Sequence, residues 1–385
     1  MPDPFQIDIP DSEIEYLNRR LAEIRWPSEV TDSGWQYGSN LAYIKELCEY
    51  WRTSFDWRAR EAELNAMPQF TTQVSADGVE DYTVHFVLQE GVGPNPFPII
   101  FTHGWPGSFF EVSKVIGPLT DPAAYGGDPE DAFTVVAPSL PGFGFSEIPS
   151  VGGFGHMRAA RMWVALMSEL GFERYGAQGG DVGARVSALT AYGDPEHCIG
   201  AQINMPNSQP PEDHPEENWN DEERAVMNRM REWQSKEAAY QWIQGTRPQT
   251  LSYGLTDSPA GLAAWIAEKW RTWSDCDGEI ETRFSKDELL TNISIYWFTR
   301  TINSSTRYYY ERRQHDQANA LPGPLKTPAG FSVFPKEIFG PPRSWVEAEY
   351  NVTQWSVHDR GGHFAAMEEP DLLVGDIREF FRPLR

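Results

Sequence analysis

The most constraining feature of the sequence is the glycine-rich pentad Gly179-Gly180-Asp181-Val182-Gly183. It lies between a predicted strand at 174–178 and a predicted helix that runs through Tyr192. Glycines permit a turn too tight for a Cβ atom, and such a turn holds its central residue in a strained, exposed position. This context is typical of a nucleophile elbow, and the helix N-terminus behind it favours negative charge. On the pentad alone, an ordinary Asp capping a helix at a glycine turn remains an alternative.

Short apolar runs alternate with amphipathic stretches along much of the chain, and this rhythm predicts the fold class. Predicted strands lie at 98–102, 133–137, 174–178, 199–204, 331–334 and 352–357, and predicted helices at 158–170 and 371–381. Strands that alternate with helices favour a mostly parallel sheet flanked by helices, the α/β class. With an elbow after a central strand, we expect the α/β-hydrolase fold.

An interruption of this rhythm predicts the domain organisation. Residues 205–221 are rich in Pro, Asn and acidic residues, and the chain beyond them reads as helical until the proline-rich run 321–330. Runs of this composition mark boundaries. We therefore expect a helical N-terminal segment packing around the catalytic domain (1–95), a first part of the α/β-hydrolase core (96–207), a helical cap (208–322) and a second part of the core (323–385).

Charge and cysteine content restrict the partners and the location. The net charge of −24 argues against nucleic acid and anionic membranes. Cys48, Cys198 and Cys276 are too few and too far apart for a disulfide framework or a metal site. The start of the chain has neither the basic nor the apolar region of a signal peptide, and no apolar run of about 18 residues is present. We expect a soluble cytoplasmic protein without metal or cofactor, and leave a homo-oligomer open.

A second glycine-rich turn could supply an oxyanion hole beside Asp181. Trp105 lies in the turn 102–108, directly after an early predicted strand. In hydrolases of this fold, a backbone N–H from that turn and one from the residue after the nucleophile form the oxyanion hole. Those residues are Trp105 and Val182 here, and the alternative is a structural turn with a buried indole.

The C-terminal part of the chain offers a base and an acid. His363 lies in the Gly-Gly-His-Phe sequence after the last predicted strand, and His358 at the end of that strand competes with it. Glu337 follows the preceding predicted strand, and its alternative is a solvated surface carboxylate. The order Asp181, Glu337, His363 reproduces nucleophile, acid and base.

A carboxylate nucleophile restricts the reaction class. Its attack on an ester or amide would give an anhydride, whereas displacement at an sp³ carbon gives an alkyl ester that activated water can hydrolyse. The leaving group is then a halide or an epoxide oxygen. An epoxide oxygen needs a proton donor, for which a phenol is suited. Tyrosines are frequent in the predicted cap, including the runs 239–241 and 304–311, although tyrosines at helical spacing are more often core residues.

Nearly the whole chain resembles the microsomal-type epoxide hydrolases. The matching sequences are RRLAEIRWP (19–27), WRTSFDWRAREAELN (51–65), HGWPGSFFE (103–111), PSLPGFGFS (138–146), GGDVGA (179–184), TRPQTLSYGLTDSPAGLAAWIAEKW (246–270), SSTRYYYE (304–311), FPKEI (334–338) and GGHFAAMEEP (361–370). The resemblance implies an epoxide hydrolase, a hydrolase acting on ether bonds, that forms a vicinal diol. It places the nucleophile on Asp181, the acid on Glu337, the base on His363 and two oxygen-polarising tyrosines on Tyr240 and Tyr309. Tyr308 and Tyr310 adjoin Tyr309 and could be confused with it.

Two other functions compete with epoxide opening. Haloalkane dehalogenases use the same nucleophile but usually carry Trp directly after it, where this chain has Val182. A non-catalytic binding protein on this fold is disfavoured by the complete set of nucleophile, acid and base. The expected partner is a small apolar or aromatic epoxide, and a natural-product intermediate is conceivable. The sequence leaves its identity and stereochemistry open.

Overall fold

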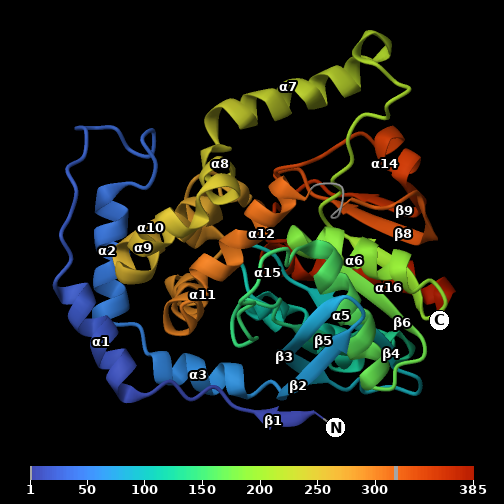
Figure 1. Ribbon diagram of the computed structural model, residues 1–385, viewed down its shortest axis with the longest axis horizontal. Coiled ribbons are helices and arrows are strands. Elements are labelled where there is room, and N and C mark those ends of the chain that lie inside the picture. The colour runs from blue at the N-terminus through green and yellow to red at the C-terminus, as the bar shows by residue number, and fades with distance from the viewer. Residues whose placement is uncertain (1, 316–319) are drawn as a thin grey trace.

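One nine-stranded sheet organises the chain (Figure 1). The computed structural model of the protein describes residues 2–315 and 320–385. In sheet order, the strands are β1 (Asp3–Phe5), β2 (Gln69–Ala76), β3 (Val79–Gln89), β5 (Phe133–Pro138), β4 (Phe97–Thr102), β6 (Tyr175–Gly179), β7 (Cys198–Ile203), β8 (Leu325–Val333) and β9 (Tyr350–Val357). Neighbouring strands from β5 to β9 are parallel, and β1, β2 and β3 add antiparallel pairs at one edge. The predicted α/β fold with a mostly parallel sheet is confirmed.

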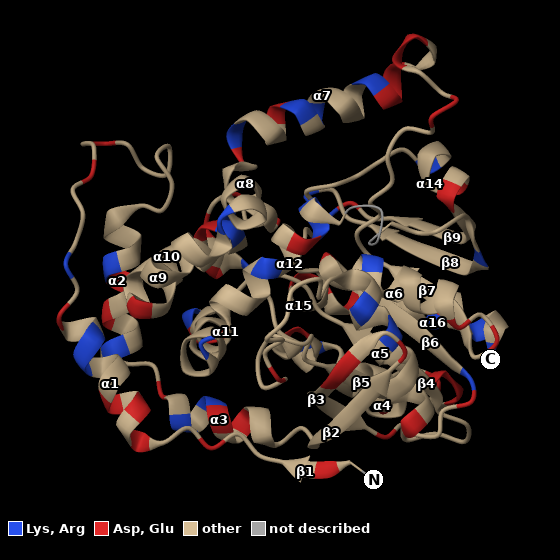
Figure 2. Ribbon diagram, in the orientation of Figure 1, with Lys and Arg blue, Asp and Glu red and all other residues tan. Residues whose placement is uncertain are grey.

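The central strands are apolar because both of their faces are covered. Along β4, Ile100 belongs to the core on one face of the sheet, whereas Ile99 and Phe101 belong to the core on the other. Alternate side chains of a strand point to opposite faces, so a parallel sheet with helices on both sides buries every position. Strands β4 to β7 accordingly carry no Asp, Glu, Lys or Arg, and charged residues collect on the surrounding helices (Figure 2).

One group of helices packs around the sheet, and the N-terminal helices form a second group, of which the first two lie beside the helices between β7 and β8 (Figure 1). The helices packed around the sheet and its ends are α4 (Ile116–Thr120), α5 (His156–Glu169), α6 (Val182–Gly193), α14 (Arg343–Glu349), α15 (Ala365–Glu368) and α16 (Pro370–Phe381). The N-terminal helices are α1 (Asp11–Ala22), α2 (Leu41–Thr53) and α3 (Trp57–Asn65). Helices α5 and α6 contact the sheet from one face and α16 packs against β7, β8 and β9, so the sheet lies between them.

Between β7 and β8 the described residues form helices and loops and no strand. These helices, Asp221–Gln314, are called the helical insertion here: α7 (Asp221–Lys236), α8 (Ala239–Thr246), α9 (Pro248–Asp257), α10 (Pro259–Trp273), α11 (Lys286–Thr299) and α12 (Ile302–Gln314). Helices α1 and α2 contact α10, so the N-terminal segment braces the insertion from outside (Figure 1). Residues 316–319 of the expected cap lie outside the described residues. Within the described ranges, none of the helices has the length and apolarity needed to cross a bilayer.

Strand β8 begins earlier than the sequence indicates. The run 321–330 reads as a loop because of its Pro and Gly content, yet β8 starts at Leu325 and includes Pro328. The pairing register of β8 with β9 shifts between Leu325 and Pro328. A bulge tolerates a residue that lacks a backbone N–H, so proline marks the irregularity and does not end the strand.

Strand β3 lies within the N-terminal segment but belongs to the main core, and matched valine substitutions test this placement. Val84 on β3 is fully buried, whereas Val92 is 59% exposed. Val84→Ala should lower the free energy of unfolding by about 2–3 kcal/mol, because methyl burial is lost and a cavity remains. Val92→Ala should change it little. Urea denaturation of both variants measures the difference, and equal effects would contradict the placement of β3 in the core.

Candidate active site

Close backbone packing fixes the turn between β6 and α6. Asp181 at this turn has φ 51° and ψ −121°, a conformation that L-residues rarely adopt. A Cβ atom at Gly179 would lie 2.4 Å from the carbonyl oxygen of Gly183, and one at Gly183 would lie 2.0 Å from that of Thr102. These contacts leave no space for side chains on either side of Asp181. The sequence therefore presents a carboxylate at the start of α6, where the helix dipole favours its charge.

The Trp105 turn meets the Asp181 carboxylate. The Trp105 N–H donates to Asp181 Oδ1 at 2.8 Å. A Cβ atom at Gly104 would lie 2.4 Å from the Asp181 Cβ, so glycine is needed for this close approach. Val182 is the first residue of α6 and lines the same cavity as Asp181. Backbone N–H groups in these positions can hold negative charge on an oxygen bonded to the Asp181 Cγ.

His363 lies on the other side of Asp181 and is paired with Glu337. Its Nδ1 is 2.7 Å from Glu337 Oε1, and its Nε2 is 3.7 Å from Asp181 Oδ2. Glu337 is held in turn by the Ile338 N–H, which donates to Oε1 at 2.6 Å. Burial lowers the pKa of His363, but the charge and hydrogen bond of Glu337, together with Asp181 and Glu111, outweigh it and raise the pKa to about 9. The imidazolium is therefore favoured while Asp181 is ionised.

Two tyrosines of the helical insertion face the same site. Tyr240 on α8 stacks on Trp105, with ring centroids 5.5 Å apart and an interplanar angle of 10°. Tyr309 on α12 meets the Trp105 ring edge-on at 5.6 Å, and the two phenol rings are 5.7 Å apart. Burial, reinforced by the nearby Asp181 charge, raises the pKa of Tyr240, and burial with Tyr240 and Asp181 raises that of Tyr309. Both phenols are therefore protonated donors at neutral pH.

The residues that could be mistaken for the phenol, the base or the acid lie outside the site. Tyr308 donates its hydroxyl to the Pro141 carbonyl at 3.1 Å and packs against other aromatic rings. His358 Nε2 is 2.7 Å from Asp376 Oδ2, and its ring stacks on Phe334. Asp359, an acidic residue close to His363 in the sequence, has a side chain that is 91% exposed and pairs with Arg360. The structure thus brings together Asp181, His363, Glu337, Tyr240 and Tyr309 and keeps these alternatives apart from them.

Glu111 is a site residue that sequence reasoning missed. Burial raises the pKa of its carboxyl to about 8, Asp181 adds to this shift and His363 opposes it. Its Oε1 occupies the space where a Cβ atom at Gly107 would lie. A neutral carboxyl beside Asp181 avoids a second buried negative charge. Its only sequence signal was its place at the end of the 103–111 run, which gave no reason to assign it a role.

A cavity of about 1170 Å³ reaches Asp181 and Val182. Its other lining residues include apolar groups from three regions of the chain: Met205, Leu321, Phe339 and Trp345. Gln241, which also lines the cavity, donates Nε2–H to the Tyr240 hydroxyl at 3.0 Å. The charged side chains of Arg185, Glu212, Arg312 and Glu349 line the cavity as well, so its lining combines apolar and charged groups. Across residues 2–315 and 320–385, no group of three or more His, Cys, Asp or Glu side chains could hold a metal ion.

The charge balance of the site predicts how His363 titrates. Asp181→Asn should lower the pKa of His363 from about 9, because one of its raising charges is removed. Glu337→Gln should lower it more, since Glu337 is the larger raising cause. NMR titration of the His363 imidazole measures both shifts, with Asp359→Asn as the exposed control that leaves the pKa in place. An unchanged titration in Asp181→Asn would contradict this geometry.

Comparisons with known proteins agree with the geometry. Residues 2–112 match the family model for the epoxide hydrolase N terminus, and residues 98–241 match that for the alpha/beta hydrolase fold. A Stigmatella aurantiaca protein, provisionally named an epoxide hydrolase, is 44% identical over 99% of this chain and 85% of its own length. Epoxide hydrolase 1 of Oryctolagus cuniculus is 38% identical over 98% of this chain and 88% of its own.

Solved structures give the same assignment. The epoxide hydrolase of Aspergillus niger superposes with a TM-score of 0.88 at 32% identity and covers 100% of this chain and 97% of its own. Juvenile hormone epoxide hydrolase from Bombyx mori gives a TM-score of 0.89 at 29% identity, covering 100% and 95%. The chain therefore belongs to the epoxide hydrolase family of the α/β-hydrolase fold.

Proposed function

We propose that this chain opens an epoxide to a vicinal diol in two steps, with Asp181 as the nucleophile. The observation that carries the proposal is that Asp181 contacts both the His363–Glu337 pair and the Trp105 N–H, and that two phenols pack on the Trp105 ring. A carboxylate nucleophile suits displacement at an sp³ carbon and not acyl transfer. Two protonated phenols suit a leaving oxygen that must gain a proton.

In the first step, Asp181 Oδ2 attacks one epoxide carbon and forms an ester bond. The bond from that carbon to the ring oxygen breaks, and the oxygen takes its electron pair and a proton from Tyr240 or Tyr309. The Trp105 N–H, bonded to Asp181 Oδ1 at 2.8 Å, orients the carboxylate so that Oδ2 is directed away from this turn. His363 takes no proton in this step.

In the second step, His363 activates water for attack on the Asp181 Cγ. Esterification removes the negative charge of Asp181, which is one cause of the raised pKa of His363, so the imidazolium gives up its proton more readily once the ester has formed. That proton returns to the phenolate left by the first step, which restores the phenol and leaves His363 neutral. Glu337 then stabilises the imidazolium that water activation produces. The Trp105 and Val182 N–H groups hold the oxyanion until the ester bond breaks. The carboxyl proton of Asp181 then passes to the departing alkoxide, which leaves as the diol and restores the carboxylate.

The cavity supports a particular kind of substrate. The apolar residues that line the 1170 Å³ cavity favour an epoxide with an apolar or aromatic body.

We infer that residues 208–322 act as a cap that supplies both tyrosines to the core formed by 96–207 and 323–385, with 1–95 packed around them. The three cysteines are free and buried, which supports a reducing, cytoplasmic location.

Trapping the ester tests the role of Asp181. His363→Gln should form the alkyl-enzyme but fail to hydrolyse it, because water has lost its base. Mass spectrometry after incubation with an aromatic epoxide should then show protein plus one intact substrate on the peptide that carries Asp181. Asp181→Ala is the control and should form no adduct. An adduct confined to another peptide would contradict the proposed mechanism.

Phenylalanine substitutions test the two phenols and separate epoxide opening from halide displacement. Tyr240→Phe and Tyr309→Phe should each slow alkylation, and the double variant should lose about 10²–10⁴-fold, the usual worth of general-acid assistance. Tyr308→Phe is the matched control, since that hydroxyl bonds the Pro141 carbonyl. Stopped-flow alkylation rates measure the effects. Alkylation at the wild-type rate in the double variant would show that the leaving group needs no proton from the phenols. That result would exclude the phenols from the mechanism and favour a halide, which leaves without a proton.

A further inference from the structure

The loop that carries His363, residues 358–364, is called the histidine loop here. Its backbone is bonded directly to the helical insertion. The His363 N–H donates to the Trp273 carbonyl at 2.9 Å, at the end of α10. The Gly361 N–H donates to Asp275 Oδ2 at 2.9 Å, and the Asp275 N–H donates to Glu368 Oε2 at 2.7 Å. The residue that carries the predicted base is therefore placed by the segment 273–275 of the insertion and not by the core alone.

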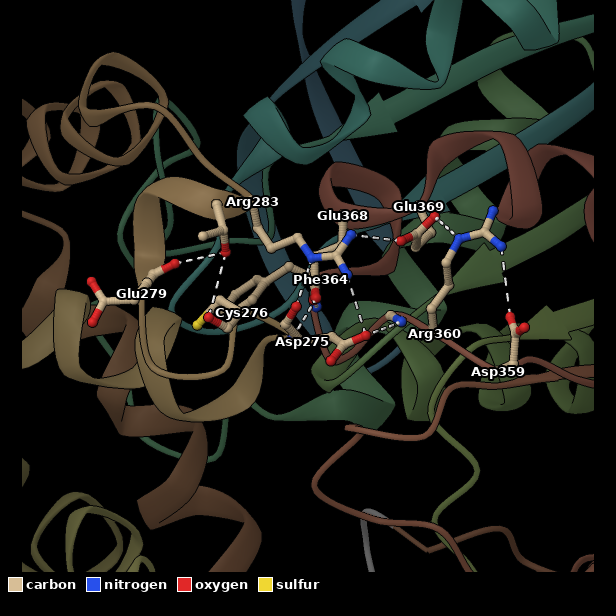
Figure 3. Close-up of polar contacts among 11 residues, drawn as sticks. Asp275, Cys276, Glu279, Arg283, Asp359, Arg360, Phe364, Glu368 and Glu369 are labelled. Carbon is tan, nitrogen blue, oxygen red and sulfur yellow. Dashed lines mark hydrogen bonds and ion pairs between the residues drawn. The ribbon is translucent and has the colours of Figure 1, made fainter.

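Arg283 fastens this segment to the histidine loop (Figure 3). Its Nε–H donates to the Asp275 carbonyl at 2.6 Å, and its Nη2 is 3.3 Å from Asp275 Oδ2. Its Nη1–H donates to Glu369 Oε1 at 2.8 Å, while the other oxygen of Glu369 accepts from Arg360 Nε at 2.8 Å. One guanidinium thus joins Asp275 in the insertion to Glu369 just beyond the histidine loop, and Glu369 in turn holds Arg360 of that loop.

These ion pairs are sheltered enough to restrict the loop. The side chains of Asp275 and Glu369 are 16% and 10% exposed, and that of Arg283 is 27% exposed. Charge pairs with this burial are screened by salt much less than fully exposed pairs. The planar guanidinium of Arg283 contacts two oxygens of Asp275, the carbonyl and Oδ2, and one of Glu369. These contacts fix the orientation of Asp275 and Glu369 relative to each other as well as the distance between them.

The loop itself has little freedom to adjust. Gly361 has φ 96°, and a Cβ atom there would lie 2.8 Å from the Phe334 ring and 2.9 Å from Glu369 Cγ. A Cβ atom at Gly362 would lie 2.6 Å from the Trp273 carbonyl oxygen. The Trp273 ring also meets the His363 imidazole edge-on at 5.0 Å. The position of the imidazole therefore depends on where Trp273 and Asp275 lie.

We propose that Arg283, with Asp275 and Glu369, forms a set of positioning residues that holds His363 in place for ester hydrolysis. The inference rests on the proposed function, in which only the second step needs the base. Loss of this connection moves the imidazole relative to the water and the Asp181 Cγ. The Trp105 N–H that orients Asp181 for the first step is bonded to Asp181 itself, and the Trp273 ring reaches the first-step groups only by packing against the rings of Trp105 and Tyr240.

Arg283→Gln should therefore slow ester hydrolysis selectively. Small displacements of a catalytic group can cost about a hundredfold, so a loss of about 10–100-fold is expected in the hydrolysis rate constant, with alkylation close to wild type. Rapid-quench mass spectrometry of the Asp181 peptide gives both rate constants, and ester should accumulate in the steady state. Arg283→Lys keeps the charge but not the fork, and should recover part of the lost rate.

Arg20→Gln is the matched control. Arg20 donates to both carboxylate oxygens of Asp257 at 2.9 Å, so its loss also breaks an ion pair between α1 and the insertion, but far from the histidine loop. It should leave the ratio of the two rate constants unchanged. If Arg283→Gln folds poorly, Glu369→Gln removes the same ion pair with little change in shape, and should shift the ratio in the same direction.

The outcomes separate the two proposals. A wild-type enzyme that turns over epoxide without ever forming an ester on Asp181 would overturn the proposed function. A wild type that forms the ester, together with Arg283→Gln and Glu369→Gln variants whose two rate constants fall equally or stay unchanged, would overturn the positioning role alone.

Discussion

The close approach of three backbone segments at Asp181 is the constraint on which the site depends. A Cβ atom at Gly104, Gly179 or Gly183 would clash with a neighbouring segment, and Asp181 is held at a positive φ among them. A non-glycine residue in such a conformation costs on the order of 1–3 kcal/mol, which the surrounding sheet and helix must offset. This packing places the carboxylate against the Trp105 N–H and at the start of α6.

Burial of charge around that carboxylate then decides the protonation of its neighbours. The buried region of low dielectric holds one imidazolium, that of His363, beside three carboxyl groups, those of Asp181, Glu337 and Glu111. Glu111 avoids excess negative charge by holding its proton, and the pKa of His363 is raised to about 9. Alkylation of Asp181 would remove one charge from this set and favour a neutral imidazole, so the first proposed step prepares the base for the second.

The fold class and the family could be predicted from the sequence, because both depend on local patterns. The alternation of apolar strands and helices indicated a parallel sheet, and the glycine pentad indicated the turn that carries Asp181. Strand β8 was placed too late because Pro328 sits at a bulge that only pairing with β9 reveals. Tyr309 could be distinguished from Tyr308 by resemblance alone, since neighbouring tyrosines on one helix look equivalent until their contacts are known.

Contacts between distant segments were beyond sequence reasoning. Nothing in the runs around Arg283 and Glu369 indicates that they meet, because their pairing depends on how the insertion lies over the core. Glu111 was visible in a glycine-rich motif, but its protonation depends on burial beside Asp181. In both cases the local sequence shows a charged residue, and only the tertiary structure shows what that charge faces.

The covalent role of Asp181 is the central claim, and a single turnover in water enriched in heavy oxygen tests it most directly. With enzyme in excess over a styrene-type epoxide, the new oxygen of the diol should be light, because that atom comes from the Asp181 carboxylate. The heavy atom should remain in the protein, on the peptide that contains Asp181. A diol carrying heavy oxygen after one turnover would mean that water attacks the epoxide directly, and would contradict the account.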